Sequence, residues 1–212
     1  MGTRLRRLLV ATTNRDKLRE IRQLLGTAPV DLQSLSDRPS VPEPDETGTT
    51  FEENARLKAR YYDQCFPSGP DDDHDTVAED SGLVIDALGG APGIHSARFV
   101  SHNASYAEKF GEIYRRLDGT ARCDRTARFV CALALVRQGV VVFETTGTIE
   151  GEIADTPKGV GGFGYDPIFY YPPYGVTLGE VSDEQKLRVA HRGVASRALA
   201  AWLGDIRSAS PR

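Results

Sequence analysis

Apolar and polar positions give the first part of the chain a clear order of elements. Leu8–Ala11 is a compact apolar run that predicts a buried strand, and the polar turn Thr12–Asn14 follows it. Apolar residues then recur at helical spacing over 18–25, and Gly26 predicts the end of that helix. The chain therefore begins as strand, polar turn and helix.

Three residue pairs have the spacing of a capping box, in which a hydroxyl at the helix start is followed three positions later by Glu or Gln. These pairs are Thr50 with Glu53, Ser105 with Glu108, and Ser182 with Gln185. They predict a helix running towards Cys65, a helix over 106–117 with one apolar face, and a short helix after 182. The apolar positions from Ala195 to Leu203 predict a closing C-terminal helix.

The middle of the chain has the pattern of paired strands. Phe129–Val136 is a long apolar run, Gly139 marks a turn, and apolar positions return over Val140–Ile149, which predicts a long antiparallel hairpin. Two segments rich in Pro and Asp, Val41–Glu46 and Pro67–Asp75, predict loops, the second exposed. The sum is an α/β chain with a mixed sheet.

Size and composition limit the partners of this chain. Its 212 residues, 40% of them hydrophobic, suffice for one substantial domain or two small lobes. A net charge of -4 lacks the excess of positive charge that binding to nucleic acid or an anionic membrane requires. Three cysteines without a Cys-x-x-Cys pattern predict buried thiols in a reducing cytosol. The N-terminal apolar run is too short for a signal peptide or a spanning helix, so we expect a soluble cytoplasmic protein.

The segment Lys158–Pro167 places two aromatic residues among four glycines. Glycine is retained where the backbone bends sharply or approaches a ligand closely. An aromatic ring held in such a loop offers a flat face that suits a nucleobase. The alternative interpretation is a surface loop with Phe163 tucked inward.

The turn from Thr12 to Lys17 lies where a strand feeds a helix. Backbone N–H groups at a helix start bind anions, and here two hydroxyls, an amide and an ammonium group add donors. The alternative is a plain N-cap at Asn14 or Thr13 with Lys17 in solvent, since no Walker pattern is present.

Glu79 and Asp80 are adjacent carboxylates that precede Ser81 and Gly82. Two neighbouring acids repel unless a cation relieves them, and oxygen ligands of this kind suit Mg²⁺. A carboxylate beside such a metal can also take a proton from an attacking water. The alternative is a solvated turn with Asp80 as a cap. The acidic segment Glu43–Glu46 could add a metal ligand or simply be solvated.

The last candidate cluster is basic. Lys186 would be a point charge for phosphate, and Arg192 beside His191 offers a planar fork for phosphate or a base carbonyl. Basic residues on an amphipathic helix are the alternative. Together the clusters supply what a nucleoside triphosphate needs: charge for the phosphates, a metal site and a slot for the base.

These motifs make the chain similar to the inosine/xanthosine triphosphate pyrophosphatases, which remove noncanonical purine nucleotides. The resemblance runs from Leu9 to about Leu203, and its markers are Ala11–Asn14 with Lys17, Thr50–Ala55, Glu79–Leu83, Leu88–Arg98, Gly161–Phe169 and His191–Gly193. It implies a single domain over 1–212, with an elongated mixed β-sheet flanked by helices and two lobes around a central nucleotide-binding cleft. It also implies a homodimer.

The resemblance further implies cleavage of the α–β phosphate bond with Mg²⁺, giving a nucleoside monophosphate and pyrophosphate from ITP, dITP or XTP. Asp80 would be the general base and a metal ligand, with Asp45 or Glu46 as the second ligand and Glu43 as a competitor. The substrate-binding residues would be Thr12, Thr13, Asn14, Arg15, Asp16, Lys17, Ser81, Phe163, Gly164, Tyr165, Asp166, Lys186, His191 and Arg192. Phe163 would stack on the base.

Three features depart from the family pattern. Glu79 stands where bacterial members often carry Asp, and Ala190 stands where many carry Ser. The acidic stretch Asp71–Asp75 looks longer than usual, and we expect it to lie outside the site. Its His74 could bind a metal together with the neighbouring aspartates, but a solvated acidic loop is the favoured interpretation. Two alternative functions remain: a Maf-type pyrophosphatase acting on modified or pyrimidine nucleotides, and a non-hydrolytic nucleotide-binding protein.

Overall fold

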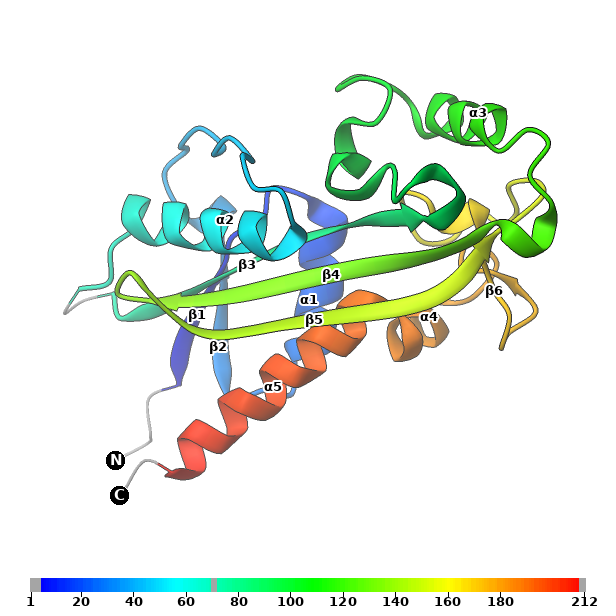
Figure 1. Cartoon of the computed structure of the whole chain (residues 1–212). Coiled ribbons are helices and arrows are strands. Elements are labelled where there is room, and N and C mark those ends of the chain that lie inside the picture. Colours follow the sequence, from blue (N-terminus) through cyan, green and yellow to red (C-terminus); the bar gives the residue numbers. More distant parts are fainter. Residues whose placement is uncertain (1–4, 70–71, 210–212) are drawn as a thin grey trace. The chain divides into compact units, whose positions relative to one another are not determined.

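The computed structural model describes residues 5–69 and 72–209. Within these residues, seven strands form one sheet of order β2-β1-β3-β4-β5-β6-β7, and helices flank it (Figure 1). The strands are β1 Arg6–Val10, β2 Val30–Ser34, β3 His74–Ile85, β4 Thr126–Arg137, β5 Val140–Ile153, β6 Phe169–Tyr171 and β7 Val176–Thr177. The helices are α1 Arg15–Leu25, α2 Phe51–Cys65, α3 Tyr106–Arg116, α4 Asp183–Val189 and α5 His191–Ala209, with short 3₁₀ turns that include η3 Gly93–Arg98.

The sheet is mixed, as the sequence predicts. β1 pairs in parallel with both β2 and β3, whereas β5, β6 and β7 pair antiparallel. β4 and β5 are joined by the two-residue turn Gln138–Gly139, where both residues have positive φ. This geometry matches the right-handed twist of an antiparallel pair, so the predicted hairpin is confirmed.

The chain divides into two compact units, each assembled from separate segments. The first unit contains Met1–Asp80, Cys131–Gly147 and Arg192–Arg212, and the second contains Ser81–Val130 and Thr148–His191. Each unit has its own apolar cluster. The cluster of the first unit unites residues of β1, α1, β3, β4 and α5, and that of the second unites residues of β3, α3, β4, β5 and β6.

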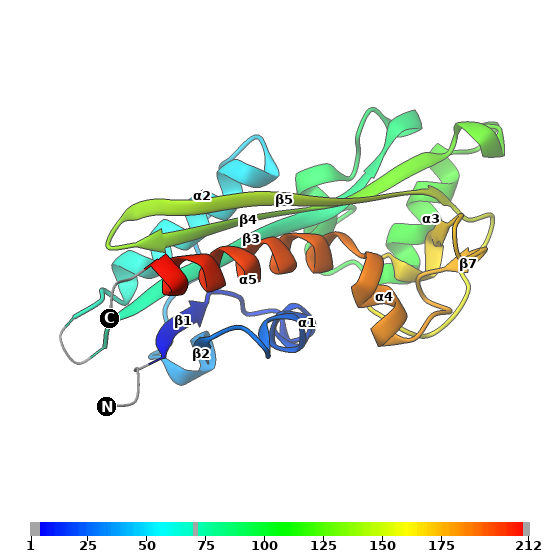
Figure 2. The same cartoon turned by 90° about the horizontal axis from the view of Figure 1, so that it is seen from below.

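Helix α5 covers the part of the sheet that belongs to the first unit (Figure 2). Its buried residues Ala195, Leu199 and Leu203 lie in one cluster with Leu8 of β1 and Leu133 of β4. The predicted C-terminal helix and its apolar face are therefore confirmed.

Side-chain caps fix the starts of the predicted helices. Reciprocal capping boxes form at the first turns of α3 and α4. At α2, Thr50 accepts a hydrogen bond from the Glu53 amide, but the Glu53 carboxylate binds Thr49 instead of Thr50. The helix begins where the sequence predicts, with half of the box displaced by one residue.

The prediction of a solvated loop over Pro67–Asp75 is wrong at its C-terminal end. His74 and Asp75 belong to β3, and each is only 1% exposed. Asp75 can be buried because Arg6 and Arg137 bind its carboxylate at 2.6 and 3.0 Å. Asp72 likewise pairs with Arg7 and Arg38; Asp71 lies outside the described residues.

The three cysteines differ in burial, and none forms a disulfide. Cys131 is buried as expected, whereas Cys65 is half-buried and Cys123 is exposed, which corrects the expectation for those two thiols. Over residues 5–69 and 72–209, none of the helices has the length and apolar character needed to span a bilayer.

Candidate active site

The turn between β1 and α1 has the shape expected of an anion site, but its own cap uses part of its capacity. The Asn14 side chain accepts hydrogen bonds from the amides of Asp16 and Lys17 at 3.0 and 3.1 Å. Thr12 accepts from the Asn14 amide at 3.2 Å. Asn14 is thus the N-cap of the alternative interpretation. The turn also presents the hydroxyls of Thr12 and Thr13, and the Lys17 ammonium group beside it lies 3.1 Å from Glu79.

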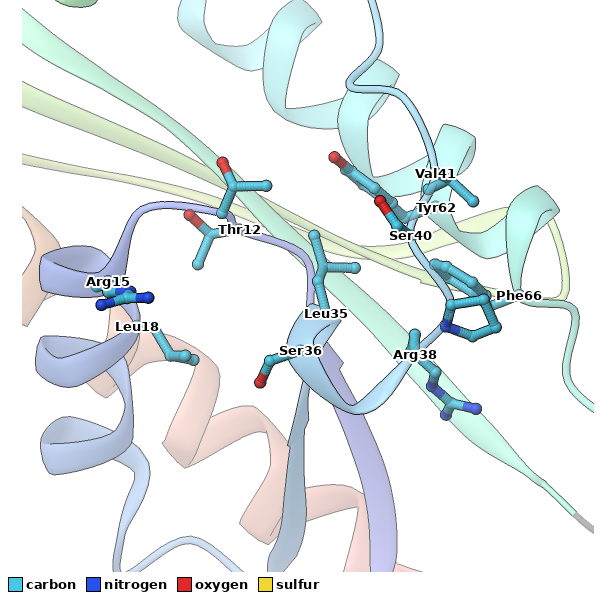
Figure 3. Close-up of a pocket in the computed structure, with 12 residues that line it drawn as sticks. Thr12, Arg15, Leu18, Leu35, Ser36, Arg38, Ser40, Val41, Tyr62 and Phe66 are labelled. Carbon is cyan, nitrogen blue, oxygen red and sulfur yellow. The ribbon is translucent and has the colours of Figure 1, made fainter.

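A cavity of about 590 Å³ opens beside this turn (Figure 3). Thr12 and Arg15 lie on one side of it, and Tyr62 of α2 and the following Phe66 lie on the other. Its lining consists of Thr12, Thr13, Arg15, Leu18, Leu35, Ser36, Arg38, Pro39, Ser40, Val41, Tyr62 and Phe66. None of these residues is acidic, so the cavity adds no repulsion against an anion at the turn.

Glu79 and Asp80 do not form a turn; both lie in the interior of β3 and are 4% and 5% exposed. Successive side chains of a strand point to opposite faces of the sheet. The two carboxylates therefore avoid each other, and each meets its own cations. The alternative interpretation, a solvated turn, is wrong because distant basic residues supply the charge that allows both acids to be buried.

Glu79 is held by two cations of the first unit. The Arg192 guanidinium binds both carboxylate oxygens, at 2.7 and 2.9 Å, and the Lys17 ammonium lies 3.1 Å from Oε1. Burial alone would raise the pKa of Glu79, but the charges of Arg192 and Lys17 hold it well below its ordinary value. Arg192 also binds Glu20 at 2.5 Å. The result is a buried, ionised network.

Asp80 faces a different set of partners. The Lys58 ammonium donates to Asp80 and to Glu46, both at 2.8 Å. Asn54 donates to Asp80 at 3.3 Å and accepts from the Gly48 amide at 2.9 Å. Burial raises the pKa of Asp80 above its ordinary value, although Lys58 opposes that shift. A carboxylate with a raised pKa is a better proton acceptor near neutral pH.

The contacts of Lys58 distinguish Glu46 from the other two upstream acids predicted as metal ligands. Lys58 joins Glu46 to Asp80, whereas Glu43 and Asp45 are exposed. Among the described residues no group of three or more His, Cys, Asp or Glu side chains is gathered for a metal ion. Mg²⁺ usually takes one or two protein carboxylates and completes its shell with water and substrate phosphates. The pair of Asp80 and Glu46 fits that requirement.

Lys58 and Asn54 are the residues that sequence reasoning misses at this site. They lie one helical turn apart on α2, which places both on one face. A polar pair at that spacing in a capped helix is a weak signal, since solvent-facing pairs have the same pattern. Only the fold brings them to Asp80.

In the second unit, the glycine loop is fastened around Asp166. Its carboxylate accepts from the Phe163 amide at 2.7 Å and from the Lys186 ammonium at 2.6 Å. Lys186 also lies 4.4 Å from the centre of the Phe163 ring. Lys186 is 2% exposed, so it does not lie on a solvated helix face as the alternative would have it. Phe163 is half-buried and keeps part of its surface open.

Two glycines make this arrangement possible. Gly162 and Gly164 have φ of +67° and +69°, which side-chain-bearing residues rarely adopt. A Cβ at Gly162 would lie 2.1 Å from an oxygen of Asp166. The backbone therefore approaches the carboxylate as closely as it does only because Gly162 lacks a side chain.

The remaining predicted residues are placed as follows. The buried His191 ring stacks on Phe129 with 4.9 Å between ring centres. Tyr165 is buried, with 4% of its surface exposed, so its ring does not offer a face to a ligand. Ser81 follows Asp80 in β3 and is half-buried. The first unit thus gathers the turn, the acids and Arg192, and the second gathers the glycine loop and Lys186.

These features define an α/β protein with a mixed sheet, a metal-compatible carboxylate pair, a helix-start anion site and an aromatic glycine loop. Comparison with known proteins gives the family. The model of the Ham1 family matches residues 8–202, and the chain belongs to this family.

Individual relatives and solved structures agree with that assignment. A protein of Geobacillus kaustophilus named dITP/XTP pyrophosphatase is 42% identical over 90% of this chain and 91% of its own length. An Exiguobacterium protein of the same name is 44% identical over 92% and 95% of the two chains. The structure of a HAM1 protein from Coxiella burnetii has a TM-score of 0.85 and 36% identity, covering 94% of this chain and 99% of that one.

Proposed function

We propose that the protein hydrolyses noncanonical purine nucleoside triphosphates (ITP, dITP and XTP) to the nucleoside monophosphate and pyrophosphate. The observation that carries the proposal is Asp80: a buried carboxylate with a raised pKa, joined to Glu46 through Lys58. The relatives named dITP/XTP pyrophosphatase, similar over nearly the whole chain, support the same reaction.

In the proposed reaction a water oxygen attacks the α-phosphorus in line with the bond to the α–β bridging oxygen. That bond breaks, pyrophosphate leaves, and Asp80 accepts the proton of the water. Lys17 and the hydroxyls of the Thr12–Thr13 turn offset charge on the phosphates. In this proposal each group acts on a different part of the triphosphate: Asp80 on the attacking water, and the cation and hydroxyls on the phosphate oxygens.

Mg²⁺ is part of the proposal, with Asp80 and Glu46 as its protein ligands. When bound, it would offset phosphate charge and lower the pKa of a coordinated water. Lys58 holds the two carboxylates near one another in spite of their like charge. Asn54 fixes the orientation of Asp80 and of the backbone at Gly48.

Base selection is proposed for the glycine loop, with Phe163 as the stacking face. A keto oxygen at the six-position accepts a hydrogen bond from a fixed donor, and an exocyclic amine cannot. A desolvated donor left unmatched is costly, so ITP and XTP should be turned over well above ATP. We also propose that the protein is a cytoplasmic homodimer. Light scattering on the purified protein measures its oligomeric state.

The test is pyrophosphate release from ITP, dITP, XTP, GTP and ATP, with and without Mg²⁺. Asp80→Asn should lower kcat by about 10²-fold or more. Its thermal midpoint should not fall, since burial of the Asp80 charge opposes folding at neutral pH. Asp86→Asn removes an exposed carboxylate that pairs with Arg128 and serves as the control with wild-type turnover.

Four outcomes contradict the proposal. A fully active, Mg²⁺-dependent Asp80→Asn variant would remove the assigned role of that carboxylate. Equal turnover of ATP and ITP would overturn the selectivity, and preference for modified pyrimidine nucleotides would indicate the Maf-type alternative. Tight ITP binding without pyrophosphate release would indicate a binding protein.

A further inference from the structure

The motif Leu88–Arg98 ends in the short turn η3, and this turn is a junction inside the second unit. Ser96 is 6% exposed, and its hydroxyl accepts from the Leu83 amide at 2.9 Å while donating to the Gly93 carbonyl at 2.6 Å. Leu83 lies in β3, so Ser96 fastens η3 to that strand. Nothing in the proposed reaction requires these contacts, yet they are buried and fully formed.

The Ser96 carbonyl has a second partner, Tyr165. The Tyr165 hydroxyl donates to it at 2.8 Å across 69 positions of sequence. The Tyr165 ring also packs edge-on to Tyr106 at 5.3 Å and near Phe110 at 6.1 Å. Because Tyr165 is only 4% exposed, its side chain points into the unit and not towards a bound base.

Tyr165 sits in the middle of the loop proposed to read the base. Phe163 and Gly164 precede it, and Asp166, which binds the Phe163 amide, follows it. Phe163 is held at its amide by the Asp166 carboxylate, which Lys186 also binds, and Tyr165 is held at its hydroxyl by the Ser96 carbonyl. Phe163 and Gly164 therefore lie between two fixed points, and a segment held in this way has little freedom to reorient.

Helix α3 supports the same turn from another direction. The Tyr106 hydroxyl lies 3.5 Å from the point that a Cβ at Gly164 would occupy. The buried Lys109 ammonium lies 4.8 Å from the centre of the Tyr106 ring and donates to the Ala97 carbonyl of η3 at 2.6 Å. Helix α3, η3 and the loop are therefore one packed assembly.

We infer that Tyr165 is a positioning residue for base selection: its hydroxyl, bound to the Ser96 carbonyl, fixes the orientation of Phe163 and Gly164. The inference rests on the proposed function and deepens it. A base is discriminated by donors and a stacking face held in one geometry, and looser geometry lets a mismatched base find an acceptable pose.

The test is Tyr165→Phe, which keeps the ring and removes only the hydroxyl. The kcat/KM ratio of ITP to ATP should fall about tenfold, mainly through a higher KM for ITP and a smaller penalty for ATP. Hydrogen exchange measured by mass spectrometry should show faster exchange of the amides over 163–166. This second readout does not depend on catalysis.

Tyr114→Phe is the matched control. Tyr114 packs against the same apolar cluster, and its buried hydroxyl has no hydrogen-bond partner within residues 5–69 and 72–209. The same chemical change there should leave both the ITP to ATP ratio and the exchange over 163–166 unchanged. A general effect of deleting a buried hydroxyl would appear in both variants.

The inference holds only if both readouts change in Tyr165→Phe and neither changes in Tyr114→Phe. A lower thermal midpoint with an unchanged ITP to ATP ratio would overturn it and leave Tyr165 a packing residue. Unchanged exchange over 163–166 would overturn it as well. If the wild-type enzyme did not prefer ITP, the proposed function would fail, and the exchange measurement would still decide whether Tyr165 orders the loop.

Discussion

Lys58 joins two carboxylates that would otherwise repel, and it is the residue on which the acid cluster depends. Burial would lower the pKa of its ammonium group, but Asp80 and Glu46 raise that pKa above its ordinary value. Lys58 therefore stays charged in a largely buried site. The neutral side chain of Lys58→Met would leave Asp80 and Glu46 without this shared donor.

We expect Lys58→Met to lower kcat/KM for ITP by about 10²-fold, because Asp80, the proposed proton acceptor, and Glu46 lose their common orientation. Pyrophosphate release at saturating Mg²⁺ measures the effect. Arg56→Met is the matched control, since Arg56 is also a cation on α2 and pairs with Glu144 at 3.0 Å away from Asp80. Loss of turnover in both variants would point to damage to α2 instead.

Glu79 makes a different prediction, which concerns stability. Its folded-state pKa lies well below its ordinary value of 4.5, so the folded protein favours the charged form more than the unfolded chain does. This stabilisation is fully present above pH 4.5 and is lost as the pH falls through the lowered folded-state pKa. Glu79→Gln would leave the buried Arg192 without its paired charge.

At pH 7 we expect Glu79→Gln to lower the free energy of unfolding by about 3–5 kcal/mol. Urea unfolding at several pH values measures this quantity. Below the ordinary pKa of Glu79 the difference between the variant and the wild-type protein should shrink, because the unfolded wild-type chain then takes up a proton at Glu79 while the folded protein still holds it ionised. A difference that stays constant down to acid pH would contradict the assigned network.

The elements show which parts of this molecule follow from local sequence. Strand β1, the hairpin of β4 and β5, and the capped helices are predicted correctly, because apolar spacing and caps are local signals. Strand β3 is the exception: Glu79 and Asp80 resemble a turn until Arg192, 113 positions away, is seen to bind Glu79. Charges that compensate each other across such separations leave no local pattern.

The candidate site divides in the same way. The Thr12–Lys17 turn and the glycine loop are visible in sequence because backbone geometry demands Asn at the cap and Gly at positive φ. The pairing of Glu46, and not Asp45, with the lysine beside Asp80 is not visible in sequence, because neighbouring acids of a loop differ only in the partner that the fold supplies. Lys58 supplies that partner here.

At the level of the glycine loop, Gly162→Ala should be costly. Its φ of +67° and the short approach to Asp166 predict a loss of about 1–3 kcal/mol in stability and a higher KM for ITP. Gly111→Ala is the control: Gly111 lies exposed in α3 with nothing within 4 Å of the position that a Cβ would take, and Ala should stabilise the helix by about 0.5–1 kcal/mol. Thermal denaturation and ITP kinetics check both.

For the whole molecule, the division into two units cuts through strands and not through linkers. It falls between Asp80 and Ser81 in β3, within β4 and β5, and between His191 and Arg192. Strands shared in this way couple the units, so we expect a single cooperative unfolding transition. Fluorescence of the sole tryptophan, Trp202 of the first unit, should coincide with far-UV circular dichroism across a urea titration. Two separated transitions would contradict this coupling.

The same division has a practical consequence for dissecting the enzyme. A gene cut at the Gln138–Gly139 turn gives two polypeptides, and each carries segments of both units. Asp80 would then be on one polypeptide, with Phe163, Lys186 and Arg192 on the other. Neither half alone contains all of the candidate active-site residues. Turnover that returns when the two halves are mixed would therefore show that they have associated. The long hairpin thereby offers a natural position for a split-enzyme sensor.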